Sequence, residues 1–169
     1  MTDAFTLTLL SEIDAEPLLT FERENRAFFA RWVTDRGDDY FSSFVARHKS
    51  LVAENQARTS LLYVVRDSDN QVVGRVNITD IHDPEVTELG YRMAQSVQGR
   101  GLATRMVSEA LAEAKAQGVR TIRARTTTRN AASQRVLERV GFSETSGHRE
   151  SLEVAGEILA VIHYKIFLA

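Results

Sequence analysis

The sequence contains no cysteine and only two prolines among its 169 residues. The missing cysteine excludes disulfides, thiolate zinc sites and a cysteine nucleophile. No apolar run approaches the roughly 20 residues that a membrane-spanning helix needs. The opening residues, MTDAFTLTLL, lack the positive charge with which a secretory signal begins. We therefore expect a cytoplasmic protein that does not associate with a membrane.

Neither sign of charge dominates, because the formal net charge is −2 with 26% charged and 43% hydrophobic residues. Proteins that wrap nucleic acid carry an excess of positive charge, so we expect no nucleic-acid partner. The four histidines are scattered without the spacing of metal ligands, and no metal site is predicted. The length suits one compact domain over residues 1–169.

Hydrophobic periodicity predicts strands and helices along the whole chain. In the first half we expect a strand over 5–10, a helix over 16–32, a second helix capped by Asp38, and strands over 60–66, 71–79 and 86–93. In the second half we expect helices over 101–117 and 130–139, and strands over 119–128, 142–152 and 157–168. The mixture predicts an α/β fold of three layers, with helices flanking a central mixed β-sheet.

The segment Glu88–Ala103 reads as a strand, a turn rich in glycine and the first turn of a helix. The first N–H groups of a helix have no internal partner, and the helix dipole adds positive charge there. Gly99 and Gly101 allow the backbone to approach a phosphate closely, and Arg100 adds a cation. The segment therefore predicts an anion-binding turn. The alternative is a tight turn that binds nothing.

Two motifs in this half of the chain resemble the GNAT superfamily of N-acetyltransferases. Gln98-x-x-Gly101-x-Ala103 after a strand resembles its acetyl-CoA signature, and Asn130 opening a helix that ends in Gly141-Phe142 resembles its second hallmark. The resemblance covers residues 60–168 well and residues 1–59 more loosely. It implies a GNAT-like fold that uses acetyl-CoA, without a metal, to acetylate a primary amine directly. The cofactor-binding residues that it implies are Met93, Ala94, Val97, Gln98, Gly99, Arg100, Gly101, Leu102, Ala103, Thr104 and Asn130.

Within that superfamily the chain resembles the branch that acetylates alanine or serine N-termini of ribosomal proteins. Ser133 after Asn130, the segment Asn25 to Trp32, and the closing residues around Gly147 and Tyr164 carry this likeness. It implies a protein or peptide N-terminal amine as acceptor, with Asn25 and Trp32 in the substrate site, and a homodimer is compatible with it. The alternatives are a small-molecule amine acceptor and a non-catalytic module that binds acetyl-CoA.

The resemblance also assigns catalytic roles. Glu88 would be the general base, acting through a water, in a strand whose bulge frees backbone N–H groups for the cofactor. The alternatives are a solvated carboxylate or an arginine partner, and Glu85 and Glu150 are rival bases.

The group that protonates the leaving thiolate is less clearly marked. Many family members use a tyrosine seven residues after the asparagine, where this chain has Leu137. Ser133 is the substitute, with Tyr91 and Tyr164 as further donors. Ser133 and Asn130 have structural alternatives as helix-capping residues. Phe28, Phe29 and Trp32 either line an acceptor groove or belong to the core.

Overall fold

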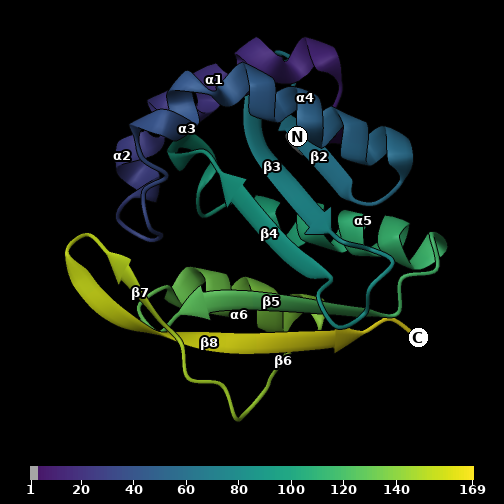
Figure 1. The fold of residues 1–169 in the computed structure, drawn as a ribbon, viewed down its shortest axis with the longest axis vertical. Helices are drawn as coiled ribbons and strands as arrows, with labels where there is room; N and C mark the ends of the chain where they lie inside the picture. Colours follow the sequence, from purple (N-terminus) through teal and green to yellow (C-terminus); the bar gives the residue numbers. More distant parts are fainter. Residues whose placement is uncertain (1–3) are drawn as a thin grey trace.

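A computed structural model describes residues 4–169 and shows an eight-stranded mixed sheet between two layers of helices (Figure 1). The strand order is β1-β2-β3-β4-β5-β8-β6, with β7 paired to β8. All pairs are antiparallel except β4 with β5. The strands are β1 (Thr6–Leu9), β2 (Leu61–Arg66), β3 (Val72–Thr79), β4 (Glu88–Met93), β5 (Thr121–Thr127), β6 (Ser143–Glu144), β7 (Ser151–Val154) and β8 (Glu157–Phe167).

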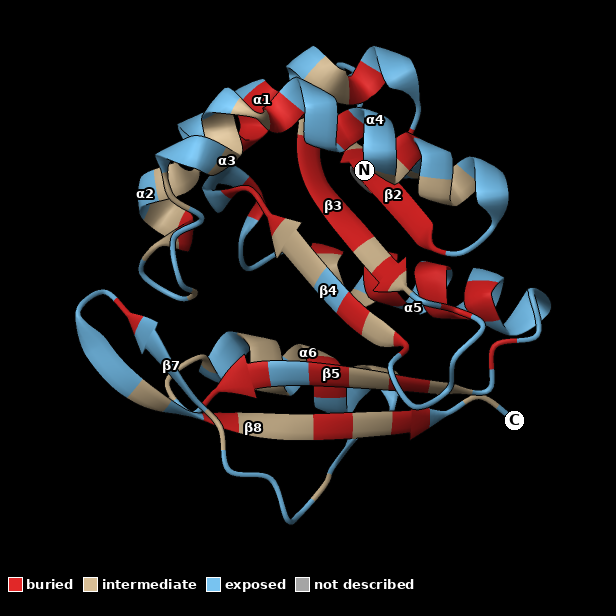
Figure 2. Cartoon of the chain, in the orientation of Figure 1, coloured by how far each residue is buried: buried red, intermediate tan, exposed pale blue. Residues whose placement is uncertain are grey.

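The helices cover both faces of the sheet, so the predicted three-layer α/β fold is confirmed (Figure 1). The helices of the first layer are η1 (Glu12–Asp14), α1 (Ala15–Glu24), α2 (Arg26–Phe29), α3 (Asp38–Ser42) and α4 (Phe44–Ala57). The opposite layer holds α5 (Leu102–Ala116) and α6 (Ala131–Val140). Buried side chains concentrate on β2, β3 and the inner side of α5, whereas the tip of the β7–β8 hairpin is exposed (Figure 2). Among the described residues no helix is both long and apolar enough to cross a bilayer.

The hairpin of β2 and β3 shows how local sequence produces this fold. The side chain of Asp67 accepts hydrogen bonds from the backbone N–H groups of Asp69 and Gln71, at 3.0 and 2.9 Å. Asn70 adopts a left-handed backbone with φ 63°, which asparagine tolerates better than most residues. The turn residues therefore fix the predicted hairpin, and the apolar strands beside it are buried.

The predicted helix over 16–32 is wrong, because the chain breaks at Asn25 between α1 and α2. The Asn25 side chain donates to the carbonyl of Phe21 at 2.9 Å and accepts from the N–H of Gln95 at 2.9 Å. This contact with a segment 70 residues away is a tertiary interaction that helical periodicity does not encode. The second helix also differs, since Gly37 rather than Asp38 is its N-cap and Ser43 separates α3 from α4.

The predicted strand over 142–152 is wrong as well, because only β6 and β7 at its two ends are extended. Between them the chain leaves β8, and Gly147 adopts a left-handed backbone with φ 88°. Strand β4 starts at Glu88 rather than residue 86, because Val86 and Thr87 donate their N–H groups to the carbonyl of Asp83 in a turn.

The junction of β4 and β5 is the feature that creates the site. These parallel strands pair only at Glu88 with Arg123 and at Leu89 with Ala124, and they then diverge. On its other side β4 pairs with β3 without a register shift from Gly74–Met93 to Thr79–Glu88. The expected bulge in β4 is therefore absent, and divergence from β5 leaves the remaining backbone of β4 without a strand partner on this side.

Candidate active site

A cleft of about 520 Å³ lies where β4 and β5 diverge. It is bounded by α2 and the turn after it, by the strands β3, β4 and β5, and by the first half of α6. Ten of the residues singled out from the sequence for cofactor, acceptor or catalysis line it, namely Phe28, Phe29, Trp32, Glu88, Tyr91, Met93, Gln98, Ala103, Asn130 and Ser133. The structure thus brings residues from distant parts of the chain into one cavity.

The turn after β4 has the geometry of an anion cradle. Gly99 and Gly101 adopt left-handed backbones with φ 77° and 71°, and a Cβ atom added to either would meet nothing within 4 Å. Gln98 ties the turn to β4, since its Nε2 donates to the carbonyl of Met93 at 2.9 Å. Helix α5 begins with Leu102, so its first N–H groups, which lack a partner within the helix, lie next to this turn. The turn therefore fits the diphosphate of a cofactor such as acetyl-CoA.

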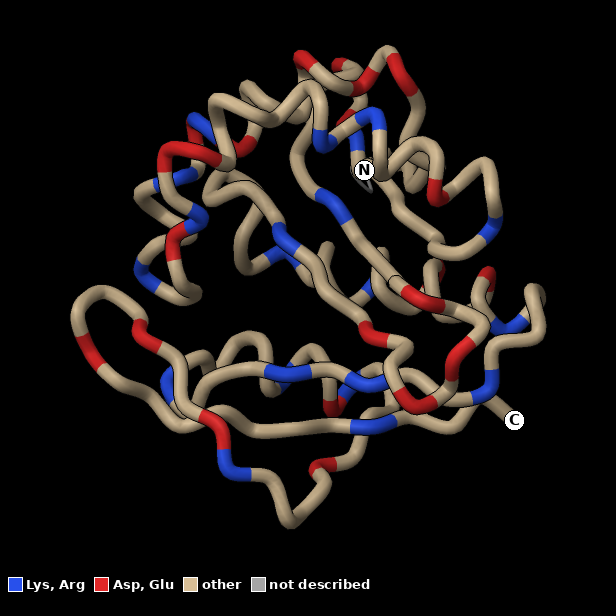
Figure 3. The backbone as a smooth tube through the Cα atoms, viewed as in Figure 1, with Lys and Arg blue, Asp and Glu red and all other residues tan. Residues whose placement is uncertain are grey.

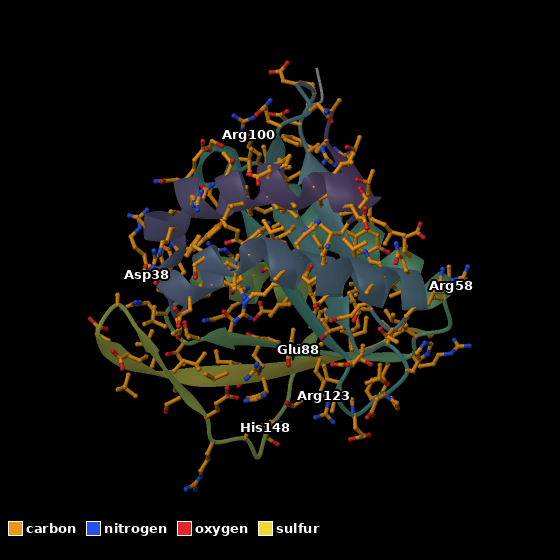
Figure 4. All side chains as sticks on the ribbon, turned by 45° about the horizontal axis from the view of Figure 1, so that its top comes forward. Asp38, Arg58, Glu88, Arg100, Arg123 and His148 are labelled. Carbon is orange, nitrogen blue, oxygen red and sulfur yellow. The ribbon has the colours of Figure 1, made fainter. Side chains whose placement is uncertain are left out.

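The remaining residues of the predicted cofactor set do not line the cleft. Ala94, Val97 and Leu102 are core residues between 4% and 6% exposed, so only their backbone atoms can contact a ligand. Thr104 lies in the first turn of α5 and also lies outside the lining. Arg100 lies well apart from Glu88 (Figure 4).

Glu88 is already bound to an arginine. Its Oε1 accepts hydrogen bonds from Nη2 and Nε of Arg125 at 3.1 and 3.3 Å. Arg125 also donates to Glu150 at 2.5 Å, and Glu150 in turn lies 3.0 Å from Nε2 of His163. Burial alone would lower the pKa of Arg125, but the two carboxylates outweigh it and raise this pKa. The Glu88 side chain is 38% exposed, so one of its sides remains accessible from the cleft.

Of the rival bases, Glu85 pairs with Arg123 at 2.9 Å and does not line the cleft. Glu150 holds Arg125 and likewise lies outside the lining. Glu88 is therefore the one carboxylate among the lining residues.

The structure joins two of the three candidate proton donors. The hydroxyl groups of Tyr91 and Ser133 are 2.9 Å apart, and both residues line the cleft. Burial raises the pKa of Tyr91 to about 12, against the opposing effect of the Ser133 hydrogen bond, so the phenol keeps its proton. Tyr164 lies outside the lining, and burial together with Glu138 and Glu144 raises its pKa.

Asn130 caps α6, because its Oδ1 accepts the backbone N–H of Ser133 at 3.2 Å. Since Asn130 also lines the cleft, capping and ligand binding are compatible at this residue. On the acceptor side Phe28, Phe29 and Trp32 line the cleft, and Trp32 is 37% exposed while Phe29 is also part of the core. Asn25, predicted to bind substrate, is absent from the lining and links α1 to the turn after β4.

Sequence reasoning missed a cluster of arginines at this end of the cleft. Arg75 and Arg92 both bind Glu22 of α1, at 3.1 and 3.2 Å. The available signal was Arg75 itself, a charged residue in the middle of an apolar strand. Within residues 4–169 no group of three or more histidine, aspartate or glutamate side chains is arranged to hold a metal ion.

Comparisons with known proteins agree with this geometry. Residues 5–143 match the acetyltransferase (GNAT) domain family. The probable N-acetyltransferase YjcK of Bacillus subtilis is 28% identical over 170 residues, covering 91% of each chain.

Two solved structures share the fold at lower identity. The ribosomal-protein-S5-alanine acetyltransferase of Vibrio fischeri has a TM-score of 0.88 at 22% identity, over 99% of this chain and 97% of that one. The spermidine N-acetyltransferase of Vibrio cholerae, in complex with CoA and spermine, has a TM-score of 0.79 at 20% identity, over 96% and 95%. Since the family match spans most of its length, this chain belongs to the GNAT family and is an acetyl-CoA-dependent acetyltransferase.

Proposed function

We propose that the protein acetylates the N-terminal amine of a protein or peptide. The observation that carries this proposal is the charge of the cleft, whose lining includes four arginines, Arg36, Arg75, Arg92 and Arg125, and a single carboxylate. A polyamine such as the substrate named for the Vibrio cholerae relative carries several positive charges, which this lining repels. A peptide N-terminus carries only one ionisable amine, and the Vibrio fischeri relative is named for such an acceptor.

The residues around the anion cradle would hold the cofactor. The backbone of Gly99 to Ala103 would bind its diphosphate, and Met93, Gln98 and Asn130 would contact its arm. Bound acetyl-CoA supplies the acetyl thioester. The divergence of β4 from β5 leaves backbone donors of β4 available for polarising a carbonyl group.

The acceptor must lose a proton to attack. An α-amine has a pKa near 7.7–8.0, so a sizeable fraction is neutral at physiological pH and the demand on a base is modest. Glu88 would accept the remaining proton through a water while Arg125 fixes the orientation of its carboxylate. Ser133 would donate a proton to the leaving thiolate, and the neutral phenol of Tyr91 would replace it.

The experiment is a comparison of acceptors by CoA release. Peptides with a free N-terminal alanine or serine, the same peptides with a blocked N-terminus and an internal lysine, and spermidine are each offered with acetyl-CoA. We expect turnover of the free α-amines and little of the other two classes. Preference for spermidine or lysine would overturn the assigned acceptor. A raised melting temperature with acetyl-CoA but no turnover of any amine would favour the non-catalytic alternative.

A further inference from the structure

An arginine cluster on the acceptor side of the cleft carries more positive charge than its partners neutralise. Arg75 and Arg92 are cross-strand partners on β3 and β4, so their side chains leave the same face of the sheet. Basic positions on both of these strands are blue in Figure 3. Both bind the carboxylate of Glu22, which is only 1% exposed. One negative charge therefore faces two positive charges.

Arg36, from the turn after α2, adds a third cation to the same wall of the cleft. Its guanidinium lies 4.7 Å from the ring centre of Tyr40, and it forms no ion pair with any acid among residues 4–169. Burial lowers the pKa of Arg92 and the charge of Arg36 lowers it further, against the opposing effect of Glu22. The three guanidinium groups (Arg36, Arg75 and Arg92, the arginine cluster) therefore repel one another.

The two acids that flank Arg36 in the sequence, Asp35 and Asp38, are bound to another arginine. Asp35 and Asp38 bind Arg26 at 2.8 and 2.9 Å, and neither lines the cleft. Asp38 is 92% exposed and lies at the edge of the molecule, away from Glu88 (Figure 4). Water screens so exposed a carboxylate effectively.

The arginine cluster also has unused hydrogen-bond donors. A guanidinium offers five N–H donors. Arg75 uses Nη1 for Glu22 and for the hydroxyl of Tyr40, and its buried Nε has no partner. Arg92 donates to Glu22 through Nη1. A planar anion with two acceptor oxygens would satisfy donors that the described protein groups leave unpaired.

We propose that the arginine cluster binds a carboxylate of the acceptor, so that the substrate is a peptide with an acidic residue beside its N-terminal amine. This inference rests on the proposed function. Glu88 and Arg92 lie on the same face of β4, about 13 Å apart along the strand at 3.3 Å per residue. Gly90 lies between them, and the space above its backbone is open. The N-terminal residue, a glutamate side chain at the second position and the water at Glu88 together cover about that distance, with the carboxylate at the arginine cluster.

The test compares acceptors that differ only in one carboxylate. Ala-Glu-Ala-amide against Ala-Gln-Ala-amide presents a side-chain carboxylate, and Ala-Ala against Ala-Ala-amide presents a C-terminal one. We expect kcat/KM to favour Ala-Glu-Ala-amide by about tenfold or more, as charge-assisted hydrogen bonds do. A preference in the dipeptide pair alone would overturn the acidic-peptide assignment and indicate a small amino-acid acceptor.

Arg36→Gln is the informative variant, because Arg36 does not bind Glu22 and its loss leaves that carboxylate paired. We expect it to reduce the preference for the acidic peptide, measured as the ratio of kcat/KM for the acidic peptide to kcat/KM for the neutral one, at least about threefold. Arg31→Gln is the matched control, since Arg31 lies in the same turn, contacts Phe28 and does not line the cleft.

The outcomes separate this inference from the proposed function. Equal kcat/KM for acidic and neutral peptides overturns the carboxylate site and leaves the N-terminal acetyltransferase intact. In Arg36→Gln, a higher KM for acetyl-CoA with an unchanged preference for the acidic peptide would assign the arginine cluster to the cofactor phosphates. That result would also overturn the carboxylate site. No acetylation of any peptide refutes the proposed function itself.

Discussion

Glu88 is held by an arginine before any substrate enters the cleft. Two nitrogen atoms of Arg125 bind one oxygen of its carboxylate, and Glu150 holds Arg125 from the other side. Such a clamp restricts the carboxylate to one orientation, which favours proton acceptance from one direction only. The pair with Arg125 is also expected if Glu88 is only a structural partner for that arginine. A substitution at Glu88 is therefore needed to distinguish the catalytic role from the structural one.

We expect Glu88→Gln to lower kcat for an N-terminal amine by roughly 10²-fold, the lower end of what general bases contribute, because the α-amine is partly neutral already. The affinity for acetyl-CoA should stay unchanged. Steady-state kinetics across pH 6–9 measure the loss, which should shrink as the amine deprotonates at high pH. Glu85→Gln is the control, since Glu85 pairs with Arg123 outside the cleft. Equal rates for both variants would leave Glu88 a structural residue.

Tyr91 makes the stability of the folded protein depend on pH in the alkaline range. Burial raises its pKa in the folded protein to about 12, whereas an unfolded tyrosine ionises near pH 10. Between these values only the unfolded chain has lost the proton, so stability falls as pH rises from 10 to 12 and is unaffected below. Tyr63, whose pKa burial also raises to about 12, adds to the same fall.

We therefore expect the urea midpoint of the wild-type protein to fall steadily above pH 10. Tyr91→Phe should show a shallower fall, because it removes one of the phenols whose pKa burial raises. Urea unfolding at half-unit steps from pH 9 to 11.5 measures both curves. An identical slope in the variant would mean that Tyr91 ionises normally.

At the scale of elements, the turn between β4 and α5 should bind acetyl-CoA through its backbone. Acetyl-CoA at 100 times its Kd stabilises a protein by about 2.7 kcal/mol, which raises Tm by roughly 5–11 °C in a domain of this size. We expect Gly101→Val to abolish that rise, because the side chain fills the open space of the cradle.

Gly118→Val provides the control for backbone strain. Gly118 also has a left-handed backbone, with φ 87°, and open space around it, but it lies at the other end of α5. Both substitutions should lower Tm in the absence of ligand, as a left-handed valine costs at least roughly 1–2 kcal/mol. Only Gly101→Val should lose the response to acetyl-CoA in a thermal unfolding assay. A preserved response would exclude the turn as the cofactor site.

Elements with a strong local signal were predictable from sequence, and those set by distant contacts were not. The apolar stripe of α5 and the turn residues before β3 determine the structure of neighbouring residues only. The predicted positions of this helix and this turn are therefore correct. The break at Asn25 depends on Gln95 instead. The extended segment expected after residue 142 fails at Gly147, where the chain turns away from β8.

At the scale of the whole molecule, Glu22 joins the N-terminal helices to the sheet. Its buried carboxylate binds one arginine from each of two strands. We expect Glu22→Gln to lower the free energy of unfolding by about 3–5 kcal/mol, because it leaves two partly buried cations without a counter-charge. Glu109→Gln, which breaks an exposed pair with Arg105 within α5, should cost at most about 0.5 kcal/mol. Urea unfolding of both variants measures the difference, and equal losses would contradict the structural role of Glu22.

The motifs of the cofactor site were visible in the sequence because they lie within short segments, 98–103 and 130–142. The acceptor side was not, because its charges come together only on folding. Glu22, Arg75 and Arg92 are separated by up to 70 residues along the chain. The pairing of Tyr91 with Ser133 likewise depends on β4 and α6 meeting across the cleft. Sequence motifs therefore indicated the chemistry, and the structure adds the arginines on which the proposed choice of acceptor rests.

The short contact between β4 and β5 also divides the sheet into two parts, β1–β4 and β5–β8. Only two residue pairs join β1–β4 to β5–β8, whereas six and seven pairs join β3 to β4 and β5 to β8. Cooperative units of a protein open separately where few contacts cross between them. We expect β5–β8 to exchange amide hydrogens by an opening that leaves β2 and β3 protected. A ligand in the cleft would contact both parts of the sheet. Acetyl-CoA should therefore bring β1–β4 and β5–β8 to a common rate of amide hydrogen exchange.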